Sequence, residues 1–161
     1  MASPTFLTST CDHFSRYVTQ VIPSTVRDAT YGLDAIRDNG TELELLEHTT
    51  DTSGYTEMVF ALFALLNLQF SPRIRDLADQ RLYRLADTPL PAGLDTVLGG
   101  QIRTDLIITH WDELLRVAGS LKLGWVTASL LLSKLQAYPR QHAPPRAPQE
   151  DGRLLQTLFI L

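Results

Sequence analysis

The residue best placed to do chemistry in this sequence is Asp51. It lies in the polar segment "HTTDTSGYT" (residues 48–56), between the strand-like run "TELELLE" and the apolar run "MVFALFALL". A carboxylate at the carboxyl end of a strand faces the crevice in which α/β proteins bind ligands. Mg²⁺ takes such oxygens together with phosphate and water. A structural alternative stays open, because Asp, Ser and Thr are also favoured caps of a following helix.

Two neighbours of Asp51 suggest a second kind of site. Glu47, His48 and Asp51 could form a mixed metal cluster, as in an unrelated metal-dependent phosphohydrolase. Adjacent residues of a strand point to opposite faces, however, so Glu47 and His48 cannot easily share one ion. Nucleophilic catalysis has little support, since Ser53 lies in "TSGYT" and not in a G-x-S-x-G elbow. The sequence has neither a P-loop nor a G-x-G-x-x-G motif.

Four arginines that follow within twelve residues are candidate phosphate contacts: Arg73, Arg75, Arg81 and Arg84. Guanidinium groups between a strand and a loop can hold phosphates in a bidentate manner. Asp76 and Asp79 are interleaved with them, so a solvated face of internally paired charges is the other interpretation. Both are kept as hypotheses.

The elements that must position Asp51 follow from the first half of the sequence. Residues 23–40 have helical periodicity, a possible capping box at Thr25 and an Asn39-Gly40 stop. Residues 41–50 are expected to form a strand, because 42–45 alternate as a strand does, although Leu46 breaks the alternation. A helix from Tyr55 to Leu66 is apolar nearly all round, which predicts burial. Ser53-Gly54 can cap that helix, Asn67 closes it, and 68–72 is a short strand candidate. Alternating helices and strands favour an α/β layer with the two strands adjacent.

The second half of the sequence is mainly helical. A turn-rich connector over 89–100 precedes a single helix over 105–121, ended at Gly124, and Thr127 caps a further helix that ends before Pro139. Trp111 lies on the apolar stripe of its helix, so Trp111 and Trp125 are expected in the core rather than on a base-stacking surface. Prolines at 139, 144, 145 and 148 predict a loose, non-helical linker over 139–152.

Composition narrows the class of protein. The chain has 161 residues, 44% of them hydrophobic, and a net charge of −4, which suits one domain or a piece of a larger protein. The charge does not indicate a nucleic-acid binder, although a local basic patch is enough for one. The single cysteine, Cys11, excludes an internal disulfide and a zinc spacing. The longest apolar run, 58–66, is shorter than the ~18 residues of a membrane span, and no signal peptide is visible.

Several longer strings, in order along almost the whole chain, carry a resemblance to a known family. They are "VIPSTVRDATYGLD", "EHTTDTSGYTEMVFALF", "LQFSPRIRDLADQRLYR", "HWDELLRVAGSLKLGWVTASLLLSKLQAYPRQ" and "GRLLQTLFIL". Together they resemble the catalytic region of the Tn-three family (TnpA) of replicative transposases. The sequence departs from the family pattern at Ser53, where members usually have Ala, at Glu57, where they usually have Asp, and in the proline-rich "HAPPRAPQEDG".

The resemblance implies an RNase H-like fold with a catalytic Asp, Asp and Glu that bind Mg²⁺, and Asp51 matches the second aspartate. The implied reaction is two-metal phosphoryl transfer that cuts and joins DNA at transposon ends. The implied location is the bacterial cytoplasm, at the nucleoid. The first aspartate is expected upstream of this chain and the glutamate downstream. The chain is therefore expected to be a transposase fragment that is inactive alone, or a remnant that at most binds DNA or a full-length transposase.

The expected fold class is α/β, a partial RNase H-like core followed by a mainly helical insertion region. Residues 1–9 are unplaced, 10–88 form the partial core in the order helix, strand, helix, strand, and 89–138 form the insertion region. Residues 139–161 form a proline-rich linker and a truncated C-terminal segment.

Overall fold

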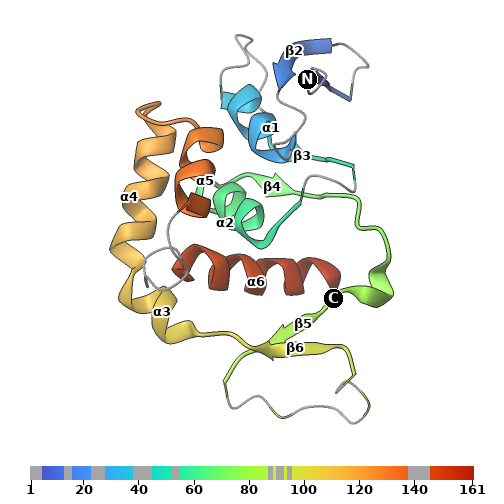
Figure 1. Cartoon of the computed structure of the whole chain (residues 1–161), viewed down its shortest axis with the longest axis vertical. Coiled ribbons are helices and arrows are strands. Elements are labelled where there is room, and N and C mark those ends of the chain that lie inside the picture. Colours follow the sequence, from blue (N-terminus) through green and yellow to red (C-terminus); the bar gives the residue numbers. More distant parts are fainter. Residues whose placement is uncertain are drawn as a thin grey trace.

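The computed structural model describes nine stretches of the chain: residues 5–12, 16–22, 28–37, 45–51, 55–86, 89, 93, 96–137 and 146–161. Figure 1 shows the arrangement from top to bottom: a β1–β2 hairpin, helix α1, a β3–β4 pair beside α2, helix α6, and a β5–β6 pair. The described strands form three separate two-stranded sheets. This mixture of helices and strands is compatible with the predicted α/β class, and the RNase H-like core stays a prediction.

A β-hairpin, which the sequence analysis did not expect, precedes the first helix. Strand β1 (Thr5–Thr10) pairs antiparallel with β2 (Arg16–Ile22). Part of the segment left unplaced, residues 1–9, therefore belongs to a strand. The expected helix is α1 (Asp28–Arg37), and its Leu33 and Ile36 are buried. Its predicted caps, at Thr25 and at Asn39-Gly40, lie outside the described residues.

The strand–helix–strand unit around Asp51 is confirmed. Strand β3 (Glu47–His48) pairs parallel with β4 (Gln69–Phe70), and helix α2 (Glu57–Leu65) connects them. Residues 41–44 lie outside the described part, so only the end of the longer predicted strand is seen. Asn67 has φ 59, a left-handed conformation that Asn tolerates better than most residues. It ends the helix as predicted and turns the chain into β4.

Helix α2 is the centre of the hydrophobic core. Val59 to Phe63 are all buried, which confirms the burial expected from a run that is apolar nearly all round. Phe63 is 0% exposed and stacks on Phe70 with 4.5 Å between ring centroids. Phe60 meets Phe70 edge to face at 5.0 Å. The end of β4 is thereby fixed against α2 by aromatic contacts that add to area burial.

The cap of α2 is Thr56 rather than the predicted Ser53-Gly54, whose residues lie outside the described part. The Thr56 Oγ1 accepts a hydrogen bond from the Val59 N–H at 3.3 Å. Replacing Thr56 by alanine is expected to lower the free energy of unfolding by about 1 kcal/mol. Urea unfolding followed by circular dichroism measures this. Thr56→Ser keeps the hydroxyl and serves as the control; a Ser variant as destabilised as the Ala variant would contradict the cap.

The single helix expected over 105–121 is two helices. Helix α3 (Thr104–Thr109) ends at His110, and α4 (Trp111–Lys122) begins directly after it. Gly124, with φ 74, ends the helical run as predicted. Thr127 precedes α5 (Ala128–Ala137), and its Oγ1 accepts from the Leu130 N–H at 3.3 Å, which confirms the predicted cap.

The core positions expected for the tryptophans are wrong. Trp111 is 46% exposed and Trp125 is 78% exposed. Helix α4 buries only Leu114 and Leu121, which are seven residues apart and lie on one narrow line of the helix. Trp111 lies beside the line of Leu114 and Leu121, although the helical periodicity of the sequence predicted it on the same apolar stripe. A stripe read from sequence is wider than the one the neighbouring helices cover.

A long helix occupies much of the predicted proline-rich linker. Helix α6 (Arg146–Ile160) includes Pro148, so the non-helical expectation for 139–152 is wrong from Arg146 on. The reason is position: Pro148 lies in the first turn, where the missing N–H has no intrahelical partner to lose. No helix within the described ranges combines the length and hydropathy needed to cross a membrane.

The remaining strands lie beside α6. After a 3₁₀ turn (Leu77–Asp79), β5 (Leu82–Arg84) pairs parallel with β6 (Leu98–Gln101). Helix α6 lies between α2 and this pair (Figure 1) and contacts both. The predicted turn-rich connector over 89–100 thus ends in a short strand.

Candidate functional site

Asp51 lies at the carboxyl end of the β3–β4 pair, as predicted. The parallel pairing extends beyond the strands proper: the N–H groups of Gln69, Ser71 and Arg73 donate to the carbonyls of Leu46, His48 and Thr50 at 2.8–2.9 Å. Asp51 is the next residue and its side chain is exposed. The carboxylate is therefore held at a strand end by a backbone ladder and is accessible to a ligand.

Two of the four predicted arginines share a cavity with Asp51. Asp51, Arg73, Ile74 and Arg75 line a space of about 380 Å³. The Arg73 N–H that bonds the Thr50 carbonyl brings these residues together across 22 positions of sequence. Both guanidinium side chains are exposed. A carboxylate and two guanidinium groups that line one cavity suit the binding of a metal ion together with a phosphate.

The other two arginines lie elsewhere. Arg81 directly precedes β5 and Arg84 is its last residue. Neither is among the residues that line the 380 Å³ cavity with Asp51. Arg81 Nη1 donates to the Thr96 carbonyl at 2.5 Å, which ties it to the chain leading into β6. The structure thus divides the predicted arginine group into a pair beside Asp51 and a pair on β5.

The mixed metal cluster of Glu47, His48 and Asp51 gains no support. Glu47 Oε1 accepts a hydrogen bond from Gln69 Nε2 at 3.2 Å. The His48 ring stacks on Phe63 at 5.5 Å, and burial lowers the pKa of His48. A Cβ at Gly32 would lie 2.6 Å from His48 Nε2, so α1 also closes over the ring. Across the ranges that the structure describes, no three His, Cys, Asp or Glu side chains gather as a metal site.

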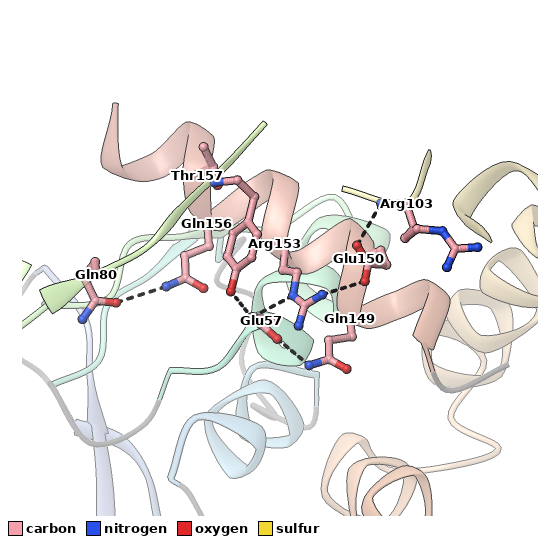
Figure 2. A network of polar contacts seen from close by, with 9 residues as sticks. Glu57, Gln80, Arg103, Gln149, Glu150, Arg153, Gln156 and Thr157 are labelled. Atoms are coloured by element: carbon pink, nitrogen blue, oxygen red, sulfur yellow. Dashed lines mark hydrogen bonds and ion pairs between the residues drawn. The ribbon is translucent and has the colours of Figure 1, made fainter. Parts of the chain in front are cut away.

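A polar network that the sequence analysis missed fixes the helix after Asp51 (Figure 2). Glu57, in the first turn of α2, accepts hydrogen bonds from Arg153 Nε at 3.1 Å and Gln149 Nε2 at 2.7 Å. Tyr83 of β5 donates its hydroxyl to the same carboxylate at 3.4 Å. The pKa of Tyr83 is raised, first by burial and then by the charge of Glu57.

The network continues to the start of α3 through a buried carboxylate. Glu150 is 7% exposed; its Oε1 accepts from Arg153 Nη1 at 2.6 Å and its Oε2 accepts from the Arg103 N–H at 3.0 Å. The one signal for it in the sequence is the Glu150–Arg153 spacing of three, which places opposite charges on one helix face. That signal was missed because the segment was not expected to be a helix.

The fold and the site define a mixed helix and strand domain that presents one carboxylate and two arginines at the end of a parallel strand pair. A family model described as the Tn3 transposase DDE domain matches residues 2–161. The match includes residues 2–9, which the sequence analysis could not place. The chain belongs to the Tn3 transposase DDE domain family.

Curated relatives agree with the family model. The chain is 45% identical to the transposase for transposon Tn21 of Escherichia coli over 157 residues, 98% of this chain and 16% of the relative. It is 43% identical to the transposase for Tn501 of Pseudomonas aeruginosa over 162 residues, 97% of this chain and 16% of the relative. It is 42% identical to the transposase for Tn1546 of Enterococcus faecium over 152 residues, 94% of this chain and 15% of the relative. The chain spans about one sixth of the length of these relatives.

Proposed function

We propose that this chain supplies one metal-binding carboxylate, Asp51, to a transposase that cuts and joins DNA at transposon ends in DNA transposition. The observation that carries the proposal is the position of Asp51: exposed, one residue beyond a parallel backbone ladder, and beside Arg73 and Arg75. The proposal includes an RNase H-like core, in which Asp51 is the second of three catalytic carboxylates. Family membership supports both.

Mg²⁺ is the proposed ion, and the donor set fits it in part. Mg²⁺ is commonly held by one or two carboxylates, with water and substrate phosphate completing its shell. Asp51 offers one such carboxylate, and among the described residues no three His, Cys, Asp or Glu side chains gather as a complete site. When bound, a pair of such ions supplies charge stabilisation for the attacking and leaving oxygens of a phosphodiester. The remaining ligands would come from other parts of the transposase.

The chain's own residues would bind and orient the DNA phosphate. Arg73 and Arg75 are placed to neutralise a phosphodiester beside Asp51, and an arginine can bind it in a bidentate manner. Arg81 and Arg84, on the β5 side, would meet DNA only at a distance from that phosphate. The network around Glu57 would keep the first turn of α2 in one position.

The test uses a chimeric transposase, in which residues 2–161 replace the matching segment of the Tn21 transposase. Asp51→Asn is expected to reduce transposition between plasmids by at least about 100-fold, since removing one group that stabilises transition-state charge commonly costs that much. Glu47→Gln, on the same strand, is the matched control and should keep transposition. An Asp51→Asn chimera that transposes as well as the unmodified chimera contradicts the proposal.

A second measurement does not depend on transposition. Mn²⁺ added to the isotope-labelled chain should broaden the amide signals of Thr50 and Asp51, and Asp51→Asn should remove the effect. His48→Ala should leave it intact, whereas a phosphohydrolase centred on Glu47, His48 and Asp51 requires its loss. The chain alone is expected not to nick transposon-end DNA in Mg²⁺, because one carboxylate cannot hold two ions. Nicking that depends on Asp51 would contradict this.

A further inference from the structure

The turn between α4 and α5, residues 122–127, exposes a large aromatic side chain. Trp125 is 78% exposed, and Leu123 beside it is 64% exposed. Leu121 belongs to the hydrophobic core, and Val126 packs against that core. The apolar side chains in and next to the turn therefore form two sets: an inner one that holds the turn to the core, and an outer pair that faces solvent.

Backbone contacts support the conformation of this turn. The Trp125 N–H donates to the Ser120 carbonyl at 3.0 Å. Gly124 has φ 74, a left-handed conformation that glycine adopts without strain. From α1, Arg37 Nη1 donates to the Val126 carbonyl at 3.2 Å. The backbone that carries the indole is thus positioned in advance, so binding a ligand there would require little ordering of the chain.

The charge of this part of the sequence differs from that of the rest. Residues 114–149 contain five Arg or Lys and no Asp or Glu, within a chain whose net charge is −4. We name this stretch the basic segment. Its Arg116, Lys122 and Lys134 are exposed. In the described part of the chain, none of these three forms an ion pair, so they are available to a negatively charged ligand.

Helix α1 brings one acid and one base to the same turn. Asp34 is 8% exposed and accepts two N–H groups at the start of α5, so it is directed at that helix and not at solvent. The Nη1 of Arg37 would lie 3.6 Å from a Cβ at Gly124. The opposite charges of Asp34 and Arg37 offset each other. The exposed Lys122 therefore sets the sign of the charge beside Trp125.

An exposed aromatic ring beside basic side chains is typical of proteins that bind single-stranded nucleic acid. Bases stack on the ring, and the cations neutralise phosphates. Lysine is depleted in protein–protein interfaces relative to the rest of the surface, so a lysine three residues from Trp125 favours a nucleic acid over a protein partner. Unpairing a base costs least where a strand is already free, as at the ends that cutting DNA produces.

We propose that the α4–α5 turn binds an unpaired nucleotide of DNA, with the base stacked on Trp125 and a neighbouring phosphate held by Lys122. For the kind of ligand, the proposal rests on the proposed role in DNA transposition. The site is a different one, since none of residues 122–127 lines a described cavity with Asp51.

The first test uses the fluorescence of Trp125. The chain has two tryptophans, Trp111 and Trp125, so Trp111→Phe leaves Trp125 as the one indole. An oligothymidine of about 12 nucleotides, within the range of lengths that such sites bind, should quench its emission, because the base would stack directly on the ring. A blunt duplex of the same length should quench it less. Trp125→Phe, which leaves the indole at the other end of α4, is the matched control and should show little quenching.

The second test is affinity, measured by fluorescence anisotropy of the labelled oligothymidine. Trp125→Leu keeps an apolar side chain without the aromatic ring and should weaken binding about tenfold, as expected for one stacked base. Trp111→Leu should bind like the unmodified chain. Lys122→Gln should lower the slope of log affinity against log salt concentration by about 0.7, the value for one phosphate of a single strand. Arg103→Gln, outside the basic segment, should leave that slope unchanged.

Equal affinity of the unmodified chain and Trp125→Leu overturns the proposal, and so does equal quenching by the duplex and the oligothymidine. Absence of binding at low salt also overturns it, and Trp125 would then be a contact for another protein. Asp51→Asn, measured without divalent metal, should bind the oligothymidine like the unmodified chain. The α4–α5 turn and the metal-binding role of Asp51 are thus tested separately, and either can fail without the other.

Discussion

Replacing Gly152 by alanine is expected to separate α2 from α6 and to lower the free energy of unfolding by about 3 kcal/mol, the upper part of the range for overpacking. A Cβ at Gly152 would lie 1.7 Å from the carbonyl oxygen of Glu57 and 2.3 Å from its carbonyl carbon. These are backbone atoms in the first turn of a buried helix, so they cannot swing aside as a flexible side chain does. The two helices must move apart.

The same displacement would break the polar network. Arg153 and Gln149 hold the Glu57 carboxylate at 3.1 Å and 2.7 Å, and they lie within one turn of Gly152 on α6. Moving α6 away from α2 takes these partners from the part-buried Glu57 carboxylate, and a buried charge without a partner is costly. The effect should therefore exceed the strain of a single methyl group.

Gly119→Ala in α4 is the matched control. A Cβ there would meet nothing within 4 Å, so the substitution should raise stability by about 0.5–1 kcal/mol, the cost of glycine inside a helix. Urea unfolding of the three chains, followed by circular dichroism, measures both changes. If Gly152→Ala unfolds at the same urea concentration as the unmodified chain, the close contact between α2 and α6 is wrong.

Local sequence signals predicted the part of the fold that positions Asp51. The run of apolar residues over α2, the stop at Asn67 and the strand that follows all depend on neighbours in sequence, and the structure has each of them. The end of β3 beside β4 follows from the strand–helix–strand order. The position of Asp51 at a strand end could therefore be deduced before the structure.

Features that depend on distant residues could not be deduced in this way. Pro148 and Gly152 both oppose an isolated helix, yet α6 forms because one lies in the first turn and the other permits contact with α2. The pairing of β5 with β6 spans residues with no strong alternation. The separation of Arg73 and Arg75 from Arg81 and Arg84 likewise depends on which strand each follows, so spacing alone grouped all four.

Replacing Asp34 by alanine is the second change expected to have a large effect, about 3 kcal/mol of unfolding free energy. Asp34 belongs to α1, is 8% exposed, and accepts the Ala128 N–H at 2.6 Å and the Ser129 N–H at 3.2 Å. It therefore caps the start of α5 from 94 residues away. Loss of a cap costs up to about 2 kcal/mol, and each buried N–H left without a partner costs about 1–3 kcal/mol.

The charge of Asp34 should matter as well as its oxygens. The N-terminus of a helix carries partial positive charge, which a carboxylate stabilises. Asp34→Asn removes the charge and keeps an acceptor oxygen for only one of the two N–H groups, so it is expected to cost about 2 kcal/mol. Thr127→Ala removes only the local cap of the same helix and should cost about 1 kcal/mol. Urea unfolding of the three variants ranks these contributions.

The expected ranking follows from how α1 holds the turn between α4 and α5. On the same helix, Arg37 Nη1 donates to the Val126 carbonyl at 3.2 Å, so α1 binds both the end of that turn and the start of α5. Thr127 can cap α5 in the absence of α1, whereas Asp34 ties the start of α5 to α1. An Asp34→Ala variant no less stable than Thr127→Ala would show that α5 is held by its own sequence and not by α1.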